Sequence, residues 1–289
     1  MHAEELLPRF LIIGGMKCAT TTLFRDLQFC PQVYIPVCKE PEVLSRAEFD
    51  PKEAAHEYKQ INKLAPKGSV VGDASTAYSK WPTHEHVPKR AMNLLGPDLK
   101  IIYLIRDPFE RTLSHFRHYR SKPESPQISF SQFLKNFPEA IDYSCYGLQL
   151  QRWMDVFSPE NFLVIPVRHY QSDRSLWVSR VCEHIDVPAP TSLPIEDKIF
   201  NQSEGRPVST GLAKIILSSS LYQKFIRPRI SANVRDFGKR FLKKSPAAKG
   251  AFSKEEQEAA EQRFMADSEL LYQLTNGAMS RTDFWNRLP

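Results

Sequence analysis

Four short apolar runs recur along the chain, separated by stretches of mixed polarity that have helical character. The runs cover residues 10–14, 69–73, 100–105 and 162–167. Runs of this length, rich in Ile, Leu and Val, are typical of strands buried on both faces of a parallel sheet. We therefore predict an α/β fold with three layers, in which helices cover both faces of a central parallel sheet.

The first apolar run leads directly into a glycine pair, a lysine and three threonines. Gly14 and Gly15 permit a tight turn and the close approach of an anion to the backbone, and Lys17 adds a positive charge there. Hydroxyl groups that can donate hydrogen bonds to phosphate oxygens follow at Thr20, Thr21 and Thr22. This strand, loop and helix predict a P-loop-like fold and a phosphate-bearing ligand.

The spacing in this loop differs from that of nucleoside triphosphatases. Their motif places four residues between its first glycine and a Gly-Lys-Ser/Thr triplet. Here Lys17 follows Gly14 by three positions, Met16 precedes it, and Cys18 stands where a metal-holding hydroxyl would be. An ordinary strand-to-helix turn with a chance lysine is the alternative interpretation of this segment alone.

A second strand, turn and helix is expected over residues 100–119. Arg106 lies where the strand ends, Asp107 can cap the next helix, and Pro108 suits its first position. Ser114 then lies two helical turns further on. Arg106 and Ser114 could grip one phosphate together, whereas a structural ion pair between Arg106 and Asp107 is the simpler alternative.

Together these two segments resemble the sulfotransferases that use 3′-phosphoadenosine 5′-phosphosulfate (PAPS). In that family the first loop holds the 5′-phosphosulfate, and an Arg-Asp-Pro strand end with a serine eight residues on holds the 3′-phosphate. The resemblance implies that Lys17 contacts the bridging oxygen and the transferred group. The donor-binding residues that it implies are Gly15, Lys17, Ala19, Thr20, Thr21, Thr22, Arg106 and Ser114.

Other segments extend the resemblance over nearly the whole chain. Lys39-Glu40-Pro41 is similar to the segment that carries a candidate general base in carbohydrate and bacterial members, which implies that Glu40 is the base. Residues 200–206 are similar to a late loop that closes over the donor, with Gly205 and Arg206 as contacts. The expected acceptor-binding residues are Asp73, Ser75, Tyr78 and His115. Histidines remain alternatives for the base, namely His84, His86, His115 and His118.

Two departures from the family pattern bear on the acceptor. Glu42, Val43 and Leu44 replace a His-Phe-Phe triplet, and Ala74 stands where heparan-type enzymes carry a lysine. Both argue against a heparan-like substrate and leave the donor site unchanged. We therefore expect a hydroxyl of a carbohydrate, lipid or small metabolite as the acceptor, and 3′,5′-adenosine bisphosphate as the product of the donor.

Two other functions stay open at this point. The first is a small-molecule kinase of P-loop type, against which the lysine spacing counts. The second is a non-catalytic protein that binds adenosine bisphosphate. We expect no metal, because His84 and His86 have no third partner in a recognised ligand motif.

Length and composition agree with one soluble sulfotransferase domain over residues 1–289. The chain is 42% hydrophobic, and its capping box at Ser253 and Glu256 predicts a C-terminal helix over about 253–275. Five cysteines without paired spacing favour free thiols in a reducing compartment. The acidic start of the chain shows no signal peptide or transmembrane segment, so we expect a cytoplasmic protein.

Positive charge is concentrated in one region. Residues 206–249 hold eleven Lys or Arg and one Asp, whereas the whole chain has a net charge of +6. We expect a basic helical segment at about 206–250, with an apolar stripe over 212–226. Such a segment suits an anionic acceptor, an acidic carrier protein or peripheral contact with a membrane. No nucleic-acid-reading motif accompanies it, and a solvated insertion is the simpler alternative.

Overall fold

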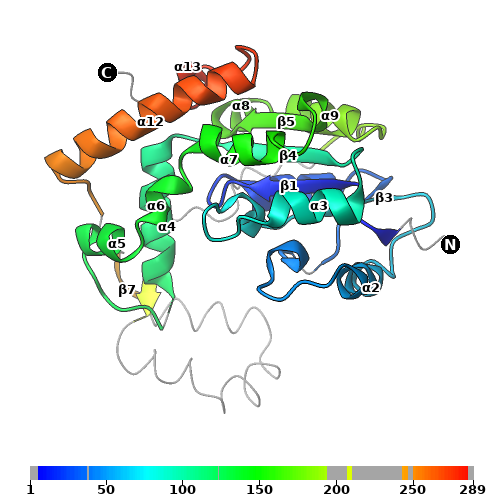
Figure 1. The fold of residues 1–289 in the computed structure, drawn as a ribbon, viewed down its shortest axis with the longest axis horizontal. Helices are drawn as coiled ribbons and strands as arrows, with labels where there is room; N and C mark the ends of the chain where they lie inside the picture. Colours follow the sequence, from blue (N-terminus) through cyan, green and yellow to red (C-terminus); the bar gives the residue numbers. More distant parts are fainter. Residues whose placement is uncertain are drawn as a thin grey trace.

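Five parallel strands form the central sheet, in the order β2-β3-β1-β4-β5 (Figure 1). The strands are β1 Phe10–Gly14, β2 Val33–Tyr34, β3 Val70–Asp73, β4 Lys100–Ile105 and β5 Phe162–Pro166. The computed structural model of the 289-residue chain describes residues 6–37, 39–122, 124–193, 207–209, 243–246 and 250–285. The four predicted strands are confirmed. The two-residue strand β2 was not predicted, because no local pattern marks so short a strand.

Both faces of the sheet are covered. Every residue of β1 is buried, and so is every residue of β4 after Lys100. Because successive side chains of a strand point to opposite faces, complete burial requires packing on both sides. The predicted three-layer α/β architecture is therefore confirmed.

The covering elements are helices, and several of them begin at a capping side chain. The helices are α1 Thr20–Leu27, α2 Pro51–Ile61, α3 Val87–Leu95, α4 Pro108–Ser121, α5 Phe130–Asn136, α6 Glu139–Asp142, α7 Tyr146–Met154, α8 Val167–Ser172, α9 Arg174–His184, α12 Lys254–Leu274 and α13 Arg281–Phe284. The connections include the 3-10 turns η2 Val43–Ser45, η3 Thr76–Ser79 and η4 Pro159–Asn161. Asp107 caps α4 as predicted, because its side chain accepts a hydrogen bond of 2.9 Å from the amide of Glu110.

The long helix α12 packs across α7, far from it in sequence (Figure 1). A glycine allows this approach: a Cβ at Gly147 would lie 2.5 Å from the carbonyl oxygen of Asp267. The Asp267 carboxylate accepts hydrogen bonds from the amides of Gly147 and Leu148 at 2.9 and 2.8 Å. The helix begins with the predicted capping box at Ser253. Its Asp267, further along, fixes the first turn of α7.

The order of the strands determines where a ligand can bind. The chain leaves β1 toward β2 and β3 on one side and later returns to β4 on the other. In open parallel sheets, ligands bind outside the carboxyl ends of the strands at such a reversal. The loops that follow β1 and β4 therefore lie at the expected binding edge.

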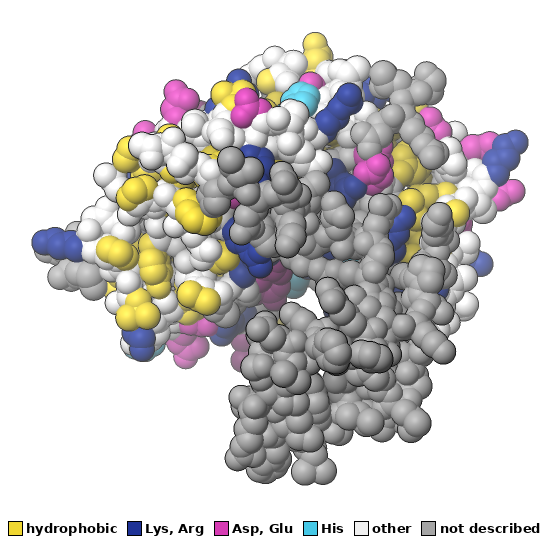
Figure 2. Space-filling view, turned by 180° about the vertical axis from the view of Figure 1, so that it is seen from behind, with side chains coloured by type: hydrophobic (Ala, Val, Ile, Leu, Met, Phe, Trp, Pro, Cys, Tyr) yellow, Lys and Arg dark blue, Asp and Glu magenta, His cyan; other side chains and the backbone are white. Residues whose placement is uncertain are grey.

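The predicted basic segment falls mostly outside the described residues. Within it the structure gives two short strands, β6 Pro207–Ser209 and β7 Lys243–Pro246, which pair antiparallel. The apolar stripe predicted over 212–226 lies outside the described residues. On the face shown in Figure 2, the described Lys and Arg side chains near the centre mix with acidic and apolar ones. None of the described helices combines the length and the apolar character needed to cross a membrane.

Candidate active site

The loop after β1 is held tightly against its neighbours. The Gly15 amide donates to the carbonyl of Leu104 in β4 at 2.6 Å, and Ser79 Oγ donates to the carbonyl of Ile13 at 2.7 Å. A Cβ at Gly14 would lie 2.1 Å from Ser79 Oγ, and the residue has a φ of 150°. Only glycine fits there, which explains the first glycine of the predicted loop.

The start of α1 is suited to an anion. Ala19 has a φ of 59° and no side chain caps the helix at this residue. Lys17 also has a left-handed φ, of 74°. Left-handed residues beside a helical start turn backbone amides toward one point, where they and the helix dipole favour negative charge. Thr20 and Thr22 are buried in the first turn, and Thr22 Oγ1 has no hydrogen-bond partner in the described part of the chain.

Arg106 connects this loop to the next strand. Its Nη1 donates to the carbonyl oxygen of Lys17 at 3.2 Å, and its Nη2 forms an ion pair with Glu110. Asp107, the partner considered in the alternative interpretation, caps α4 with its side chain. The structure therefore brings Lys17 and Arg106, 89 residues apart in the chain, to one edge of the sheet.

Helix α4 carries two more of the predicted residues. Ser114 is buried, and His115 lies edge-on against Phe133 with ring centroids 5.3 Å apart. Burial and the neighbouring Arg111 hold the pKa of His115 well below its usual range. Its Nδ1 is buried without a hydrogen-bond partner among the described residues. A neutral ring of this kind is a weak base at neutral pH.

Glu40 lies in a short segment between β2 and η2. Its carboxylate pairs with Lys39 and accepts a hydrogen bond of 3.3 Å from Thr76 Oγ1. The Glu40 side chain is 33% exposed, so it is open to solvent while also held by the protein. The backbone of Glu40 is left-handed, with a φ of 65°.

Three of the predicted acceptor residues lie inside the protein. Asp73, Ser75 and Tyr78 are each at most 2% exposed. They hydrogen-bond to one another, because Ser75 Oγ and Tyr78 OH both donate to the Asp73 carboxylate. Their assignment to the acceptor site stays a prediction.

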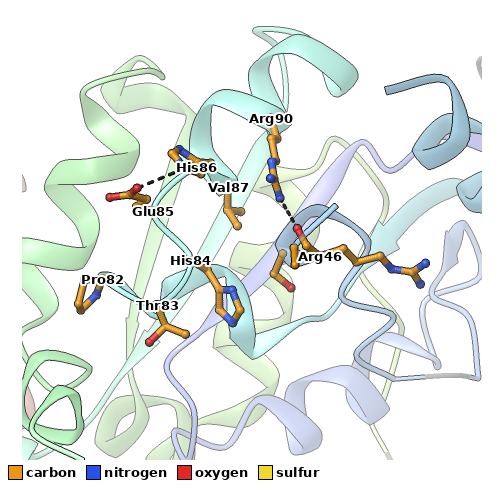
Figure 3. A pocket seen from close by; sticks show the side chains of 10 residues that line it. Arg46, Pro82, Thr83, His84, Glu85, His86, Val87 and Arg90 are labelled. Atoms are coloured by element: carbon orange, nitrogen blue, oxygen red, sulfur yellow. Dashed lines mark hydrogen bonds and ion pairs between the residues drawn. The ribbon is translucent and has the colours of Figure 1, made fainter. Parts of the chain in front are cut away.

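A cavity of about 300 Å³ adjoins the segment that follows Glu42 (Figure 3). Arg46 lines it on one side, and His84 and Arg90 line it from the loop before α3 and from that helix. The Arg90 Nη1 atom donates to the carbonyl of Arg46 at 2.7 Å, which fixes this wall. Burial and the nearby Lys80 lower the pKa of His84. The cavity thus has walls of mixed polarity, and its histidine is neutral near pH 7.

The remaining site predictions have different outcomes. Gly205 and Arg206 lie outside the described residues. Within the part of the chain that the structure describes, no group of three potential metal ligands occurs. Sequence reasoning missed Tyr58 of α2, whose hydroxyl donates to Asp73 at 2.8 Å. Only the folded chain brings these residues together, so no local pattern could have revealed the contact.

Comparison with known proteins agrees with this geometry. The family of the Sulfotransferase domain matches residues 8–227, which is most of the chain. The chain belongs to the sulfotransferase domain family. The bifunctional heparan sulfate N-deacetylase/N-sulfotransferase 3 of Homo sapiens is 26% identical over 201 residues, covering 63% of this chain and 23% of that protein. The carbohydrate sulfotransferase 15 of Mus musculus is 23% identical over 306 residues, which cover 73% of this chain and 53% of that protein.

A solved sulfotransferase shares the fold. The crystal structure of the sulfotransferase from Alicyclobacillus acidocaldarius superposes with a TM-score of 0.61 at 20% identity, covering 94% of this chain and 97% of that one. The match covers about a quarter of the length of the first curated relative named above and about half of the length of the second. The match of the family over residues 8–227 confirms the predicted resemblance to sulfotransferases, and the solved structure shows the shared fold.

Proposed function

We propose that this protein transfers the sulfuryl group of PAPS to a hydroxyl group. The single observation that carries the proposal is the hydrogen bond between Arg106 and the backbone of Lys17. It joins the two segments that family resemblance assigns to the 3′-phosphate and the 5′-phosphosulfate. The donor-binding roles of Gly15, Ala19, Thr20, Thr21, Thr22, Ser114, Gly205 and Arg206 belong to the same proposal.

The reaction follows from the charges in the site. The acceptor oxygen attacks sulfur and forms a new S–O bond, while the bond from sulfur to the 5′-phosphate oxygen breaks. Lys17 stabilises the charge that develops on the departing phosphate oxygen, as positioned cations do in phosphoryl transfer. The hydroxyl proton passes to the Glu40 carboxylate, and 3′,5′-adenosine bisphosphate leaves with the bonding electrons.

Glu40 is the base that we favour. Its carboxylate is partly exposed, as a group that must reach a substrate requires, and it is held in place by its ion pair with Lys39. His115 is a poorer choice, because burial disfavours its protonated form. No step of this mechanism requires a metal ion.

We propose that the acceptor is a carbohydrate, a lipid or a small metabolite. The cavity beside Arg46 and His84 supports this, because one of its walls is formed by residues 45–47, which follow Glu40 closely in the chain. The excess of Lys and Arg over 206–249 supports an anionic acceptor or one presented by an acidic carrier protein. Peripheral membrane contact through this segment remains an alternative proposal, and nucleic acid is not proposed as a partner.

The described thiols support a cytoplasmic location, which is likewise a proposal. Cys18, Cys30, Cys145 and Cys182 are all free and buried. Reduced cysteines are expected in the cytoplasm.

The proposed function is tested by supplying the protein with PAPS and a panel of alcohols. Release of 3′,5′-adenosine bisphosphate that depends on an alcohol, together with a sulfated product, supports it. Transfer of a phosphate from magnesium ATP to the same alcohols, without turnover of PAPS, would instead show a kinase. Binding of the bisphosphate without any transfer would show a non-catalytic binding protein.

A further inference from the structure

A buried carboxylate lies directly beneath the segment that carries Glu40. Asp73 is 1% exposed, and its two oxygens accept hydrogen bonds from three hydroxyl groups. Ser75 Oγ donates at 2.6 Å, Tyr78 OH at 2.6 Å and Tyr58 OH at 2.8 Å. A buried carboxylate with this many donors orients every one of them.

Two of these hydroxyl groups also hold the backbone that follows Glu40. Ser75 Oγ accepts a hydrogen bond from the amide of Glu42 at 3.1 Å. Tyr78 OH accepts one from the amide of Leu44 at 3.3 Å. Each hydroxyl donates to Asp73 and accepts from this segment, so its single proton is directed by the carboxylate. Tyr58 makes no such bond to residues 40–44 in the described structure.

The segment needs this support because its backbone is unusual. Glu40 and Glu42 both have left-handed φ angles, 65° and 57°. Left-handed backbone at a residue with a Cβ is strained and persists only where the surroundings fix it. Pro41, between them, adds stiffness but offers no amide hydrogen.

The side chain of Glu40 is held from the same turn. Thr76 Oγ1, next to Ser75 in η3, donates to Glu40 Oε2 at 3.3 Å. Turn η3 and its N-cap Ser75 therefore hold both the carboxylate of Glu40 and the backbone amides of Glu42 and Leu44. The turn itself is anchored by Asp73 at the end of β3.

We propose that Asp73 is a positioning residue, which holds Glu40 toward the acceptor through Ser75 and Tyr78 without touching a substrate itself. The inference rests on the proposed role of Glu40 as the base. In this proposal Asp73, Ser75 and Tyr78 hold Glu40 in place, instead of contacting the acceptor directly as the sequence led us to expect.

Two tyrosines provide a matched test. Tyr78→Phe and Tyr58→Phe each remove one buried hydroxyl that donates to Asp73, but only Tyr78 also holds Leu44. With PAPS as donor and water as acceptor, we expect Tyr78→Phe and Ser75→Ala to lower kcat about tenfold or more. The KM for PAPS should change by less than about twofold, and Tyr58→Phe should stay close to the unaltered protein.

Amide hydrogen exchange gives a second readout that needs no acceptor. We expect the amides of Glu42 and Leu44 to exchange at least about tenfold faster in Ser75→Ala and Tyr78→Phe, respectively, than in Tyr58→Phe. Equal exchange and equal kcat in the two tyrosine variants would overturn the inference. A change confined to the KM for PAPS would also overturn it, because that result would show that the network supports donor binding.

A double-mutant cycle separates this inference from the proposed function. If Ser75 acts through Glu40, then Ser75→Ala should cost little further activity in a Glu40→Gln background. Additive losses would contradict positioning, even where Glu40 is the base. A fully active Glu40→Gln variant would contradict the proposed base, while the exchange measurement would still report whether the network holds the segment.

Discussion

Arg106 donates a hydrogen bond from Nη1 to the backbone carbonyl of Lys17, at 3.2 Å. The contact joins the end of β4 to the turn after β1, at the carboxyl ends of the strands. Glu110 pairs with the other terminal nitrogen. An arginine held on two sides in this way is preorganised for a phosphate.

We predict that Arg106→Ala weakens binding of 3′,5′-adenosine bisphosphate by about 2–4 kcal/mol, which is roughly a 30- to 1,000-fold loss of affinity. The cause is the loss of a charged hydrogen-bond donor to the 3′-phosphate. Calorimetric titration measures it. Arg120→Ala on helix α4 is the matched control, because Arg120 is bonded to Gln127 at a surface position.

The same variant discriminates between the two phosphates of the donor. Adenosine 5′-phosphosulfate lacks the 3′-phosphate, so its binding should change little in Arg106→Ala. If both ligands lose the same affinity, Arg106 acts by holding the Lys17 loop rather than by binding the 3′-phosphate.

Lys17→Ala should lower turnover of PAPS by about 10²- to 10³-fold, because it removes the charge that stabilises the departing phosphate. Initial-rate measurements at saturating donor give the value. Lys52→Ala, on the exposed first turn of α2, serves as the control for loss of a positive charge. Near-normal turnover in a folded Lys17→Ala protein would contradict the assignment of the loop.

How far could the sequence predict this site? The strands, the glycine turn and the Asp107 cap follow from local patterns, because each depends on neighbours in the chain. The hydrogen bond from Arg106 to Lys17 and the burial of Asp73 depend on strand order, which no local pattern specifies. Tyr58 escaped prediction for the same reason, since it approaches Asp73 only through the packing of α2.

Glu40→Gln should lower turnover by about 10²- to 10⁴-fold, the usual contribution of a positioned base, and leave the affinity for 3′,5′-adenosine bisphosphate unchanged. Kinetics and calorimetry on the same preparation separate these effects. Glu48→Gln, an exposed carboxylate eight residues further on, is the control. A large loss of turnover in His86→Ala or His115→Ala, with Glu40→Gln still active, would assign the base to a histidine.

Asp267 should make stability depend on pH. Burial raises its pKa to about 6 from a usual value of 3.8, despite hydrogen bonds from the amides of Gly147 and Leu148 that lower it. Between these two pH values the folded protein holds a proton that the unfolded chain has released. Stability from this group is therefore full below about pH 4, and it is lost as the pH rises through about 6.

The size of this effect is roughly 3 kcal/mol, from the free energy that corresponds to each pKa unit. Urea unfolding at several pH values between 4 and 7 measures it. We expect Asp267→Asn, which cannot ionise, to lose less stability over this range than the unaltered protein. Parallel curves for the two proteins would show that Asp267 has the same pKa in the folded and unfolded states.

The most direct test of the account is calorimetric titration of the protein with 3′,5′-adenosine bisphosphate, beside ATP with magnesium. The joined loops of Lys17 and Arg106 predict micromolar binding of the bisphosphate without magnesium, and weak binding of ATP. Preference for magnesium ATP, or no binding of the bisphosphate, would contradict the assignment of PAPS as the donor.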